Sequence, residues 1–266
     1  MGWASMNEDN ESRFFNATII RNEVDKKMNT PKNSPEKGGA ITKLKAFAAP
    51  QARPLPVIIL ADVSGSMAEN GKIEALNVAI KQMVTSFGKE SRLRADIQVG
   101  LITFGGRQAD LHLPLISAHS VSEVEAFTAV GATPMGAAFE LARQLLEDKE
   151  RVPARAYRPV LVLVSDGVPT DDWEKPLAAL KGSERAQKAS RFAMAIGADA
   201  DRELLAQFAD DVEAPVFEAH EADDIRRFFR AVTMSVVARS SSPSPDQPLT
   251  LDVSEIPADD LDLDAI

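Results

Sequence analysis

The chain has 266 residues, of which 44% are hydrophobic, enough for the core of one large or two small domains. Its net charge of -10 argues against nucleic acid as the main partner, and the absence of cysteine excludes disulfides, thiolate metal sites and cysteine nucleophiles. Because no apolar run approaches the roughly 20 residues of a membrane span and no signal peptide is evident at the N-terminus, we expect a cytoplasmic protein without a membrane partner.

Both ends of the chain have the composition of tails. Residues 1–53 include the stretch MNTPKNSPEKGGA and only short apolar patches, which predicts a flexible N-terminal tail; docking of the Phe14–Ile20 segment is the alternative. Residues 240–266 begin SSSPSPDQP and carry seven acidic and no basic side chains, which predicts a disordered acidic C-terminal tail. This tail is interpreted as a solubilising segment, an interaction peptide, or a ligand for the basic face that Arg226, Arg227 and Arg230 form on the last helix.

Between the tails, residues 54–239 alternate strand-like and helix-like segments, which predicts one doubly wound α/β domain. Its sheet should be mostly parallel, with helices on both faces and one short antiparallel edge strand. In chain order, the expected elements are a strand at 57–62, a helix at 72–87, a strand at 97–104, an edge strand at 111–115, a helix at 136–150, strands at 159–166 and 192–197, and helices at 203–209 and 222–237. The edge position of 111–115 follows from Pro114, because proline cannot donate to a central ladder.

Oxygen-bearing side chains follow the predicted strands, where open α/β sheets bind their ligands. The first strand ends in Asp62-Val63-Ser64-Gly65-Ser66, and Asp166 follows a later strand. Thr133 lies between them in the loop Gly131-Ala132-Thr133-Pro134-Met135-Gly136. Carboxylates and hydroxyls are hard ligands, so the set predicts a site for Mg²⁺, with Mn²⁺ or Ca²⁺ as alternatives.

The order Asp62-x-Ser64-x-Ser66, then Thr133, then Asp166 resembles the metal-ion-dependent adhesion site of the von Willebrand factor A-type (vWA) domain. The resemblance covers residues 54–239. Within that family, LPVIILADVSGSM, GATPMG and SDGVPTDDW are similar to the bacterial TerY-like branch, named for tellurite resistance.

The resemblance implies that the hydroxyls of Ser64, Ser66 and Thr133 bind the cation, while Asp62 and Asp166 act directly or through water. A partner protein would supply a Glu or Asp to the remaining position. The TerY-like branch implies a protein kinase and a PP2C-type phosphatase as partners, in stress resistance or phage defence. We therefore expect a metal-dependent binding module that is a monomer alone.

The segment that follows Asp166 contains Asp171, Asp172 and Trp173. We predict that these three residues line the rim where a partner binds. The competing interpretation is structural: Asp171 or Asp172 would cap a helix that begins near Trp173, and the indole would pack on that helix. The three histidines of the chain are scattered without ligand-like spacing, so we expect structural or exposed roles for them.

The alternative to a kinase- and phosphatase-linked adaptor is a vWA adaptor subunit of an AAA+ ATPase of the MoxR or chelatase type; the chain itself has no GxxxxGK[ST] sequence. An enzyme is not expected, because Ser64 stands where haloacid-dehalogenase phosphatases have a second Asp, and no His or Lys is recognisably placed as a base.

Overall fold

The computed structural model describes residues 52–90, 92–209, 216–249 and 251. Nearly all of the predicted N-terminal tail, including the Phe14–Ile20 segment, lies outside these residues. Of the predicted C-terminal tail, residues 250 and 252–266 also lie outside them. No helix in the described ranges combines the length and the apolarity needed to cross a membrane.

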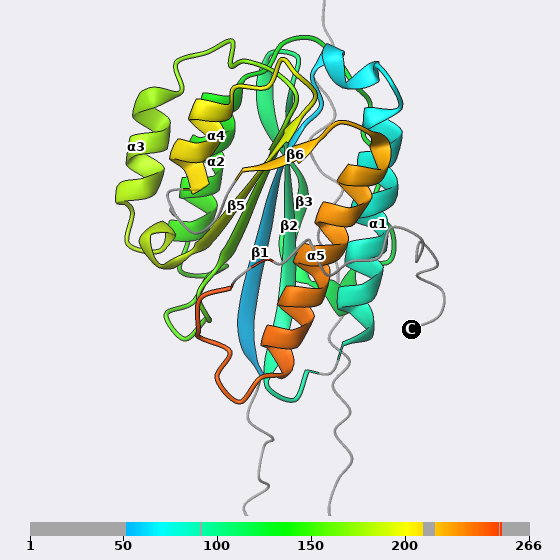
Figure 1. Ribbon diagram of the computed structural model, residues 1–266. Coiled ribbons are helices and arrows are strands. Elements are labelled where there is room, and N and C mark those ends of the chain that lie inside the picture. The colour runs from blue at the N-terminus through cyan, green and yellow to red at the C-terminus, as the bar shows by residue number, and fades with distance from the viewer. Residues whose placement is uncertain (1–51, 91, 210–215, 250, 252–266) are drawn as a thin grey trace, which may run out of the picture. The chain divides into compact units, whose positions relative to one another are not determined.

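A six-stranded sheet with the order β3-β2-β1-β4-β5-β6 forms the centre of the fold (Figure 1). The strands are β1 (Arg53–Asp62), β2 (Ala95–Gly105), β3 (Gln108–Ser117), β4 (Val160–Ser165), β5 (Ser190–Ile196) and β6 (Phe217–Ala219). All neighbours pair in parallel except β2 and β3. The predicted doubly wound sheet with one antiparallel edge strand is therefore confirmed; the short β6 was not predicted.

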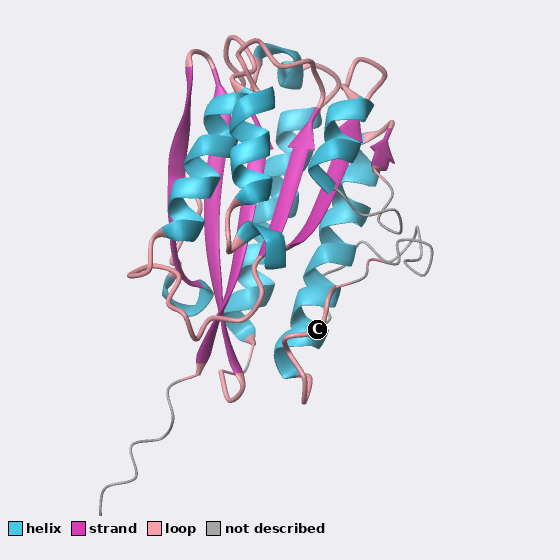
Figure 2. Cartoon of the chain, turned by 90° about the vertical axis from the view of Figure 1, so that its left-hand side faces the viewer, coloured by secondary structure: helices cyan, strands magenta, loops and turns pink. Residues whose placement is uncertain are grey.

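Helices cover both faces of the sheet. The helices α1 (Lys72–Lys89) and α5 (Ala222–Ser241) lie side by side on one face. On the other face lie α2 (Met135–Glu147), α3 (Glu174–Gly182) and α4 (Arg202–Ala209), which Figure 2 shows in front of the strands. Each helix that the sequence pattern predicted is present, with ends that differ by a few residues.

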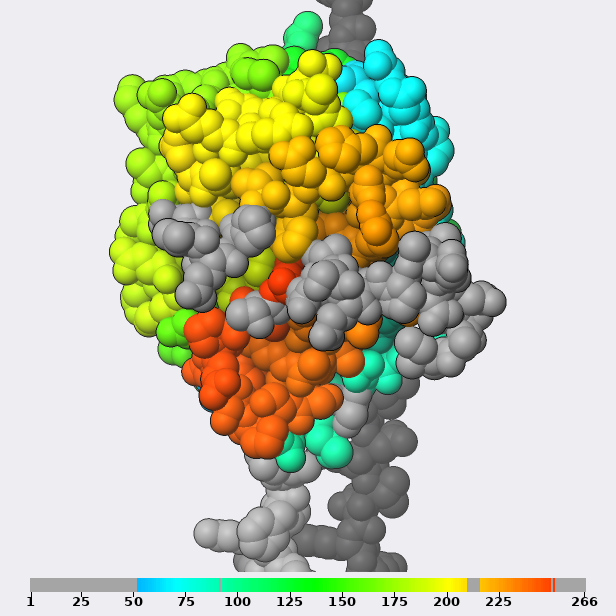
Figure 3. All heavy atoms as spheres, viewed as in Figure 1, coloured from blue at the N-terminus to red at the C-terminus, as the bar shows by residue number. Residues whose placement is uncertain are grey.

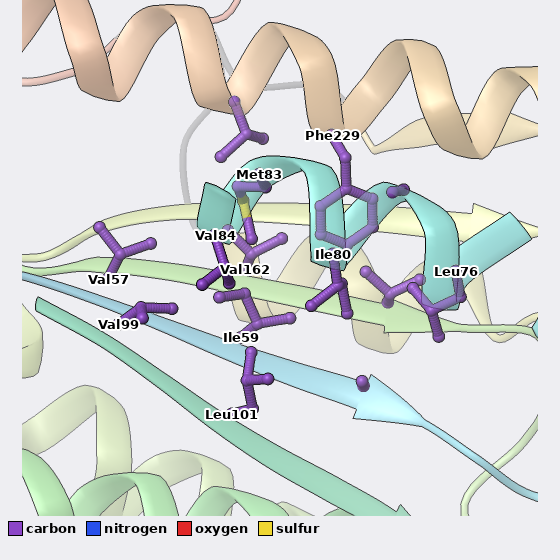
Figure 4. Close-up of a cluster of buried hydrophobic side chains, with 14 of the residues drawn as sticks. Val57, Ile59, Leu76, Ile80, Met83, Val84, Val99, Leu101, Val162 and Phe229 are labelled. Carbon is purple, nitrogen blue, oxygen red and sulfur yellow. The ribbon is translucent and has the colours of Figure 1, made fainter. Parts of the chain in front are cut away.

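The alternation of side chains along β1 divides the core into two clusters. Val57 and Ile59 point to the face covered by α1 and α5, where they meet Met83 and Phe229 (Figure 4). Ile58 and its neighbour Leu60 belong to the second cluster, under α2, α3 and α4. Because both faces of β1 are buried, its apolar run is continuous rather than alternating.

The sheet order places a topological switch between β1, which leads into α1 on one face, and β4, which leads into α3 on the other. Strands on the two sides of such a point lead into helices on opposite faces, and a crevice opens at their carboxyl ends. The turns after β1 and β4 meet there, at the upper end of the fold in Figure 1.

Candidate metal centre

Asp62, at the end of β1, is fully buried and is held on both carboxylate oxygens. Its Oδ1 accepts a hydrogen bond from the backbone N–H of Ser64 at 2.8 Å, and its Oδ2 accepts one from the Ser165 hydroxyl at 2.6 Å. Burial raises the pKa of Asp62, while the hydrogen bonds from Ser165 and Ser64 oppose that rise. The carboxylate is thus fixed in direction but poorly solvated, a state that a nearby cation would stabilise.

A chain of hydrogen bonds links the two serines of the first turn to Asp166 after β4. The hydroxyls of Ser64 and Ser66 lie 3.1 Å apart, and the Ser66 hydroxyl donates to Asp166 Oδ1 at 2.7 Å. Asp166 is 1% exposed, whereas Ser66 is exposed, so the cluster opens to solvent at Ser66. Residues 100 positions apart therefore meet because β1 and β4 are parallel neighbours.

Thr133 enters the cluster from the loop before α2. A methyl group built on Gly167 would lie 3.7 Å from Thr133 Oγ1, which places this hydroxyl beside the turn that contains Asp166. The backbone N–H of Gly65 donates to the Gly131 carbonyl at 2.9 Å and joins the loop to the first turn. The structure thus brings together all five predicted ligands: Asp62, Ser64, Ser66, Thr133 and Asp166.

Glycine is required where the Thr133 loop packs against the turn after β4. A Cβ on Gly136 would lie 2.3 Å from the Asp172 carbonyl oxygen and 3.0 Å from Trp173 Cα, and these backbone atoms cannot rotate away. Gly131 has a φ of 65° and would bring a Cβ within 2.6 Å of Gly106 Cα. Both close approaches hold the Thr133 hydroxyl at the cluster.

Sequence reasoning missed Lys72, the first residue of α1. Its ammonium donates to Asp166 Oδ2 at 2.7 Å, and its side chain is 17% exposed. A cation in the first turn of a helix interacts unfavourably with the helix dipole. This unfavourable position of Lys72 in the sequence could have indicated that a carboxylate lies nearby. The contact of Ser165 with Asp62 was missed as well. The register of β1 and β4 explains this contact, because Ala61 pairs with Val164 and the next residues of the two strands are Asp62 and Ser165.

Asp171 caps a different helix from the expected one. Its two carboxylate oxygens accept hydrogen bonds from the backbone N–H groups of Gly136 and Ala137, each at 2.9 Å, in the first turn of α2. The helix near Trp173 is α3, whose N-cap residue is Trp173 itself, without a side-chain cap. The interpretation that Asp171 or Asp172 caps α3 is therefore wrong, because the Gly136 contact brings the start of α2 within reach of Asp171.

The other two rim residues differ in exposure. The Asp172 side chain is 65% exposed and lies 3.7 Å from Lys175. Trp173 is half-buried and packs against the second core cluster. A contact of Asp171, Asp172 or Trp173 with a partner remains a prediction.

We expect Asp171→Ala to lower the free energy of unfolding by about 1–2 kcal/mol, because two N-terminal amides of α2 lose their acceptor. Asp172→Ala is the matched control and should change it by less than about 0.5 kcal/mol, since an exposed ion pair contributes little. Urea denaturation of both variants measures the difference. Equal effects of the two substitutions would contradict the assigned cap.

The donor set fits a hard divalent cation. Two carboxylates and three hydroxyls supply only oxygen, and Thr133 Oγ1 makes no hydrogen bond to any other described residue. Within the described ranges no group of three or more His, Cys, Asp or Glu side chains is arranged to hold a metal. The ring nitrogens of His112 and His119 bond instead to the carbonyls of Glu125 and Glu90.

Comparisons with known proteins agree with this architecture. Residues 57–231 match the model of the von Willebrand factor type A domain family. Protein Rv2850c of Mycobacterium tuberculosis is 32% identical over 140 residues, which is 46% of this chain and 21% of that protein. The chain thus matches about a fifth of the length of this curated relative.

Solved structures are similar at the level of the fold. A von Willebrand factor type A protein from Catenulispora acidiphila has a TM-score of 0.55 at 19% identity, over 70% of this chain and 42% of that one. Proximal thread matrix protein 1 from the mussel byssus has a TM-score of 0.56 at 16% identity, over 71% of this chain and 49% of that one. A structure of the same mussel protein with a zinc-occupied metal-ion-dependent adhesion site (MIDAS) motif has a TM-score of 0.52 at 16% identity. The match covers 71% of this chain and 48% of that one.

Proposed function

Since a family model matches 57–231, the chain belongs to the von Willebrand factor type A domain family, and we propose that it is a metal-dependent protein-binding module. The observation that carries the proposal is the convergence of Asp62, Ser64, Ser66, Thr133 and Asp166 at the carboxyl ends of β1 and β4. The zinc-occupied MIDAS motif of the mussel protein supports a divalent cation at the corresponding place.

The residues of the cluster would hold Mg²⁺, or Mn²⁺ or Ca²⁺, through hydroxyl and carboxylate oxygens. With three neutral hydroxyls and only two carboxylates, the bound cation would supply the positive charge that attracts a Glu or Asp of a partner protein. Lys72 already neutralises part of the charge of Asp166, which leaves the site more attractive to a third carboxylate. The exposed side at Ser66 is where that group would enter.

The surroundings favour binding over catalysis. The cluster contains Lys72, but its ammonium is occupied by Asp166. The imidazoles of His112 and His119 bond to backbone carbonyls on other segments. With the Lys72 ammonium and these two imidazoles already hydrogen-bonded, we propose that the chain is not an enzyme.

The partner class rests on the sequence resemblance to the TerY-like branch. GATPMG and SDGVPTDDW contribute Thr133, Asp166 and the rim, so the same residues that build the site carry the resemblance. We propose that the module works in the cytoplasm and binds a protein kinase or PP2C-type phosphatase in a stress-resistance or phage-defence system.

The test is capture of the partner by the tagged full chain, with identification by mass spectrometry. We expect a kinase or phosphatase to be retained in Mg²⁺ and lost in EDTA, and Thr133→Val to lose it in both buffers. Thr85→Val removes a hydroxyl from the exposed side of α1, where it bonds to the Lys81 carbonyl, and should retain the partner. Equal capture by wild-type protein in Mg²⁺ and EDTA would contradict the proposal.

A further inference from the structure

A groove of about 280 Å³ runs between α1 and α5, on the face of the sheet away from α2, α3 and α4. Its floor is apolar: Met83 and Phe229 are each 1% exposed, and Figure 4 shows them over the sheet. Met234 also lines the groove and is 55% exposed, so it adds accessible apolar surface beside the floor.

The rim of this groove is positively charged although the chain as a whole is acidic. Lys89, Arg226 and Arg230 line it, with Glu90 as the single carboxylate among the lining residues. Arg226 is paired with Asp223 on its own helix, and its side chain remains 32% exposed. A ligand that combines aliphatic groups with negative charge would match both the floor and the rim.

The end of the printed sequence has this combination. Residues 252–266 read DVSEIPADDLDLDAI, in which six acidic residues are interleaved with Val, Ile and Leu and no basic residue occurs. We propose that this segment binds in the groove between α1 and α5 of its own chain. The proposal is independent of the metal site.

The path of the chain makes such binding feasible. After α5 the chain turns back along the helix (Figure 3), and the backbone N–H of Leu249 donates to the Ser190 hydroxyl at 3.1 Å. Leu249 and Leu251 pack against the core cluster that contains Phe229, so the chain reaches residue 251 on the face that carries the groove. Fifteen further residues span up to about 50 Å when extended, whereas the 20 residues of α5 are about 30 Å long.

The tethering also strengthens a weak contact. A segment attached close to its binding site is present at an effective concentration in the millimolar range, so modest apolar burial and a few exposed ion pairs are sufficient for occupancy. Because exposed ion pairs are screened by salt, occupancy should fall as the ionic strength rises.

Disulfide trapping in the full chain tests the proposal. Because the chain has no native cysteine, only the two introduced cysteines can form a disulfide within it. Met234→Cys is combined with Leu263→Cys, and the rate of intramolecular disulfide formation is measured under mild oxidation. The control combines Leu263→Cys with Val78→Cys, because Val78 is an exposed apolar residue of α1 (43%) that does not line the groove. We expect the first pair to form at least about tenfold faster than the control.

A matched pair of charge reversals distinguishes binding of the segment in the groove from random collisions of a tethered segment with the domain. Lys89→Glu removes a cation from the rim, whereas Lys81→Glu makes the same change at an exposed position of α1 outside the groove. Added to the Met234→Cys, Leu263→Cys chain, the first should slow trapping severalfold, as high salt should, and the second should not. Equal rates for the two cysteine pairs, or equal effects of the two charge reversals, would overturn the proposal. Predominantly intermolecular disulfides would also overturn it and would indicate that a second copy of the chain occupies the groove.

Discussion

Asp62→Asn is expected to abolish the stabilisation of the folded chain by divalent cations. At a cation concentration 100 times the dissociation constant, a single site on the native state adds about 2.7 kcal/mol to the free energy of unfolding. For a domain of this size each kcal/mol raises Tm by about 2–4 °C. Thermal unfolding of the wild type in Mg²⁺ or Mn²⁺ and in EDTA should therefore differ by several degrees, and Asp62→Asn should show no difference.

The substitution is informative because Asn can keep both local contacts, one of them with the direction of the hydrogen bond reversed. Asn Oδ1 can accept from the Ser64 N–H as Asp62 does, and the amide nitrogen can donate to the Ser165 hydroxyl. Burial raises the pKa of Asp62, which means that its charge costs folding free energy at neutral pH. The metal-free variant should consequently be at least as stable as the metal-free wild type.

Asp172→Asn is the control for this experiment, since it makes the same chemical change on a side chain that is 65% exposed. It should retain the full metal-dependent rise in Tm. If Asp62→Asn kept that rise, the cation would bind elsewhere on the chain.

Lys72→Met is expected to have opposite effects on the metal-free and metal-bound protein. Without metal, the buried Asp166 carboxylate would lose its cationic partner at 2.7 Å, which should lower the free energy of unfolding by about 3 kcal/mol. With metal, the repulsion between the ammonium and the cation is removed. The Lys72 ammonium and a divalent cation bound beside Asp166 repel each other, so affinity for Mn²⁺ should rise at least about tenfold.

Isothermal titration with Mn²⁺ and urea denaturation in EDTA measure these two effects separately. Lys72→Arg keeps the charge and should resemble the wild type in both. A fall in Mn²⁺ affinity in Lys72→Met would show that Lys72 acts mainly by holding Asp166 in place.

The parts of the site that could be predicted from the sequence are those fixed by the ends of strands. Asp62 and Asp166 directly follow apolar runs that are buried on both faces, and parallel neighbours bring such ends together. Thr133 was identified by its order in the chain relative to these residues. Strand order brings the two aspartates together, whereas the Thr133 loop reaches them through the close approaches at Gly131 and Gly136.

The contacts that were missed depend on the packing of helices and loops. Asp171 lies within three residues of α3, yet its carboxylate caps α2, because Gly136 allows the two backbones to approach. Lys72 meets Asp166 only after α1 has packed on the sheet, 94 positions away in sequence. The strand β6 has three residues, too few for a periodic pattern to indicate it.

Crystals of the full chain grown with Mn²⁺ provide the most direct test, through the anomalous scattering of the ion. We predict one anomalous peak per chain, surrounded by oxygen atoms of Ser64, Ser66 and Thr133 and adjacent to the carboxylates of Asp62 and Asp166. A peak at another place, or none at these five side chains, would contradict the assignment of a metal centre.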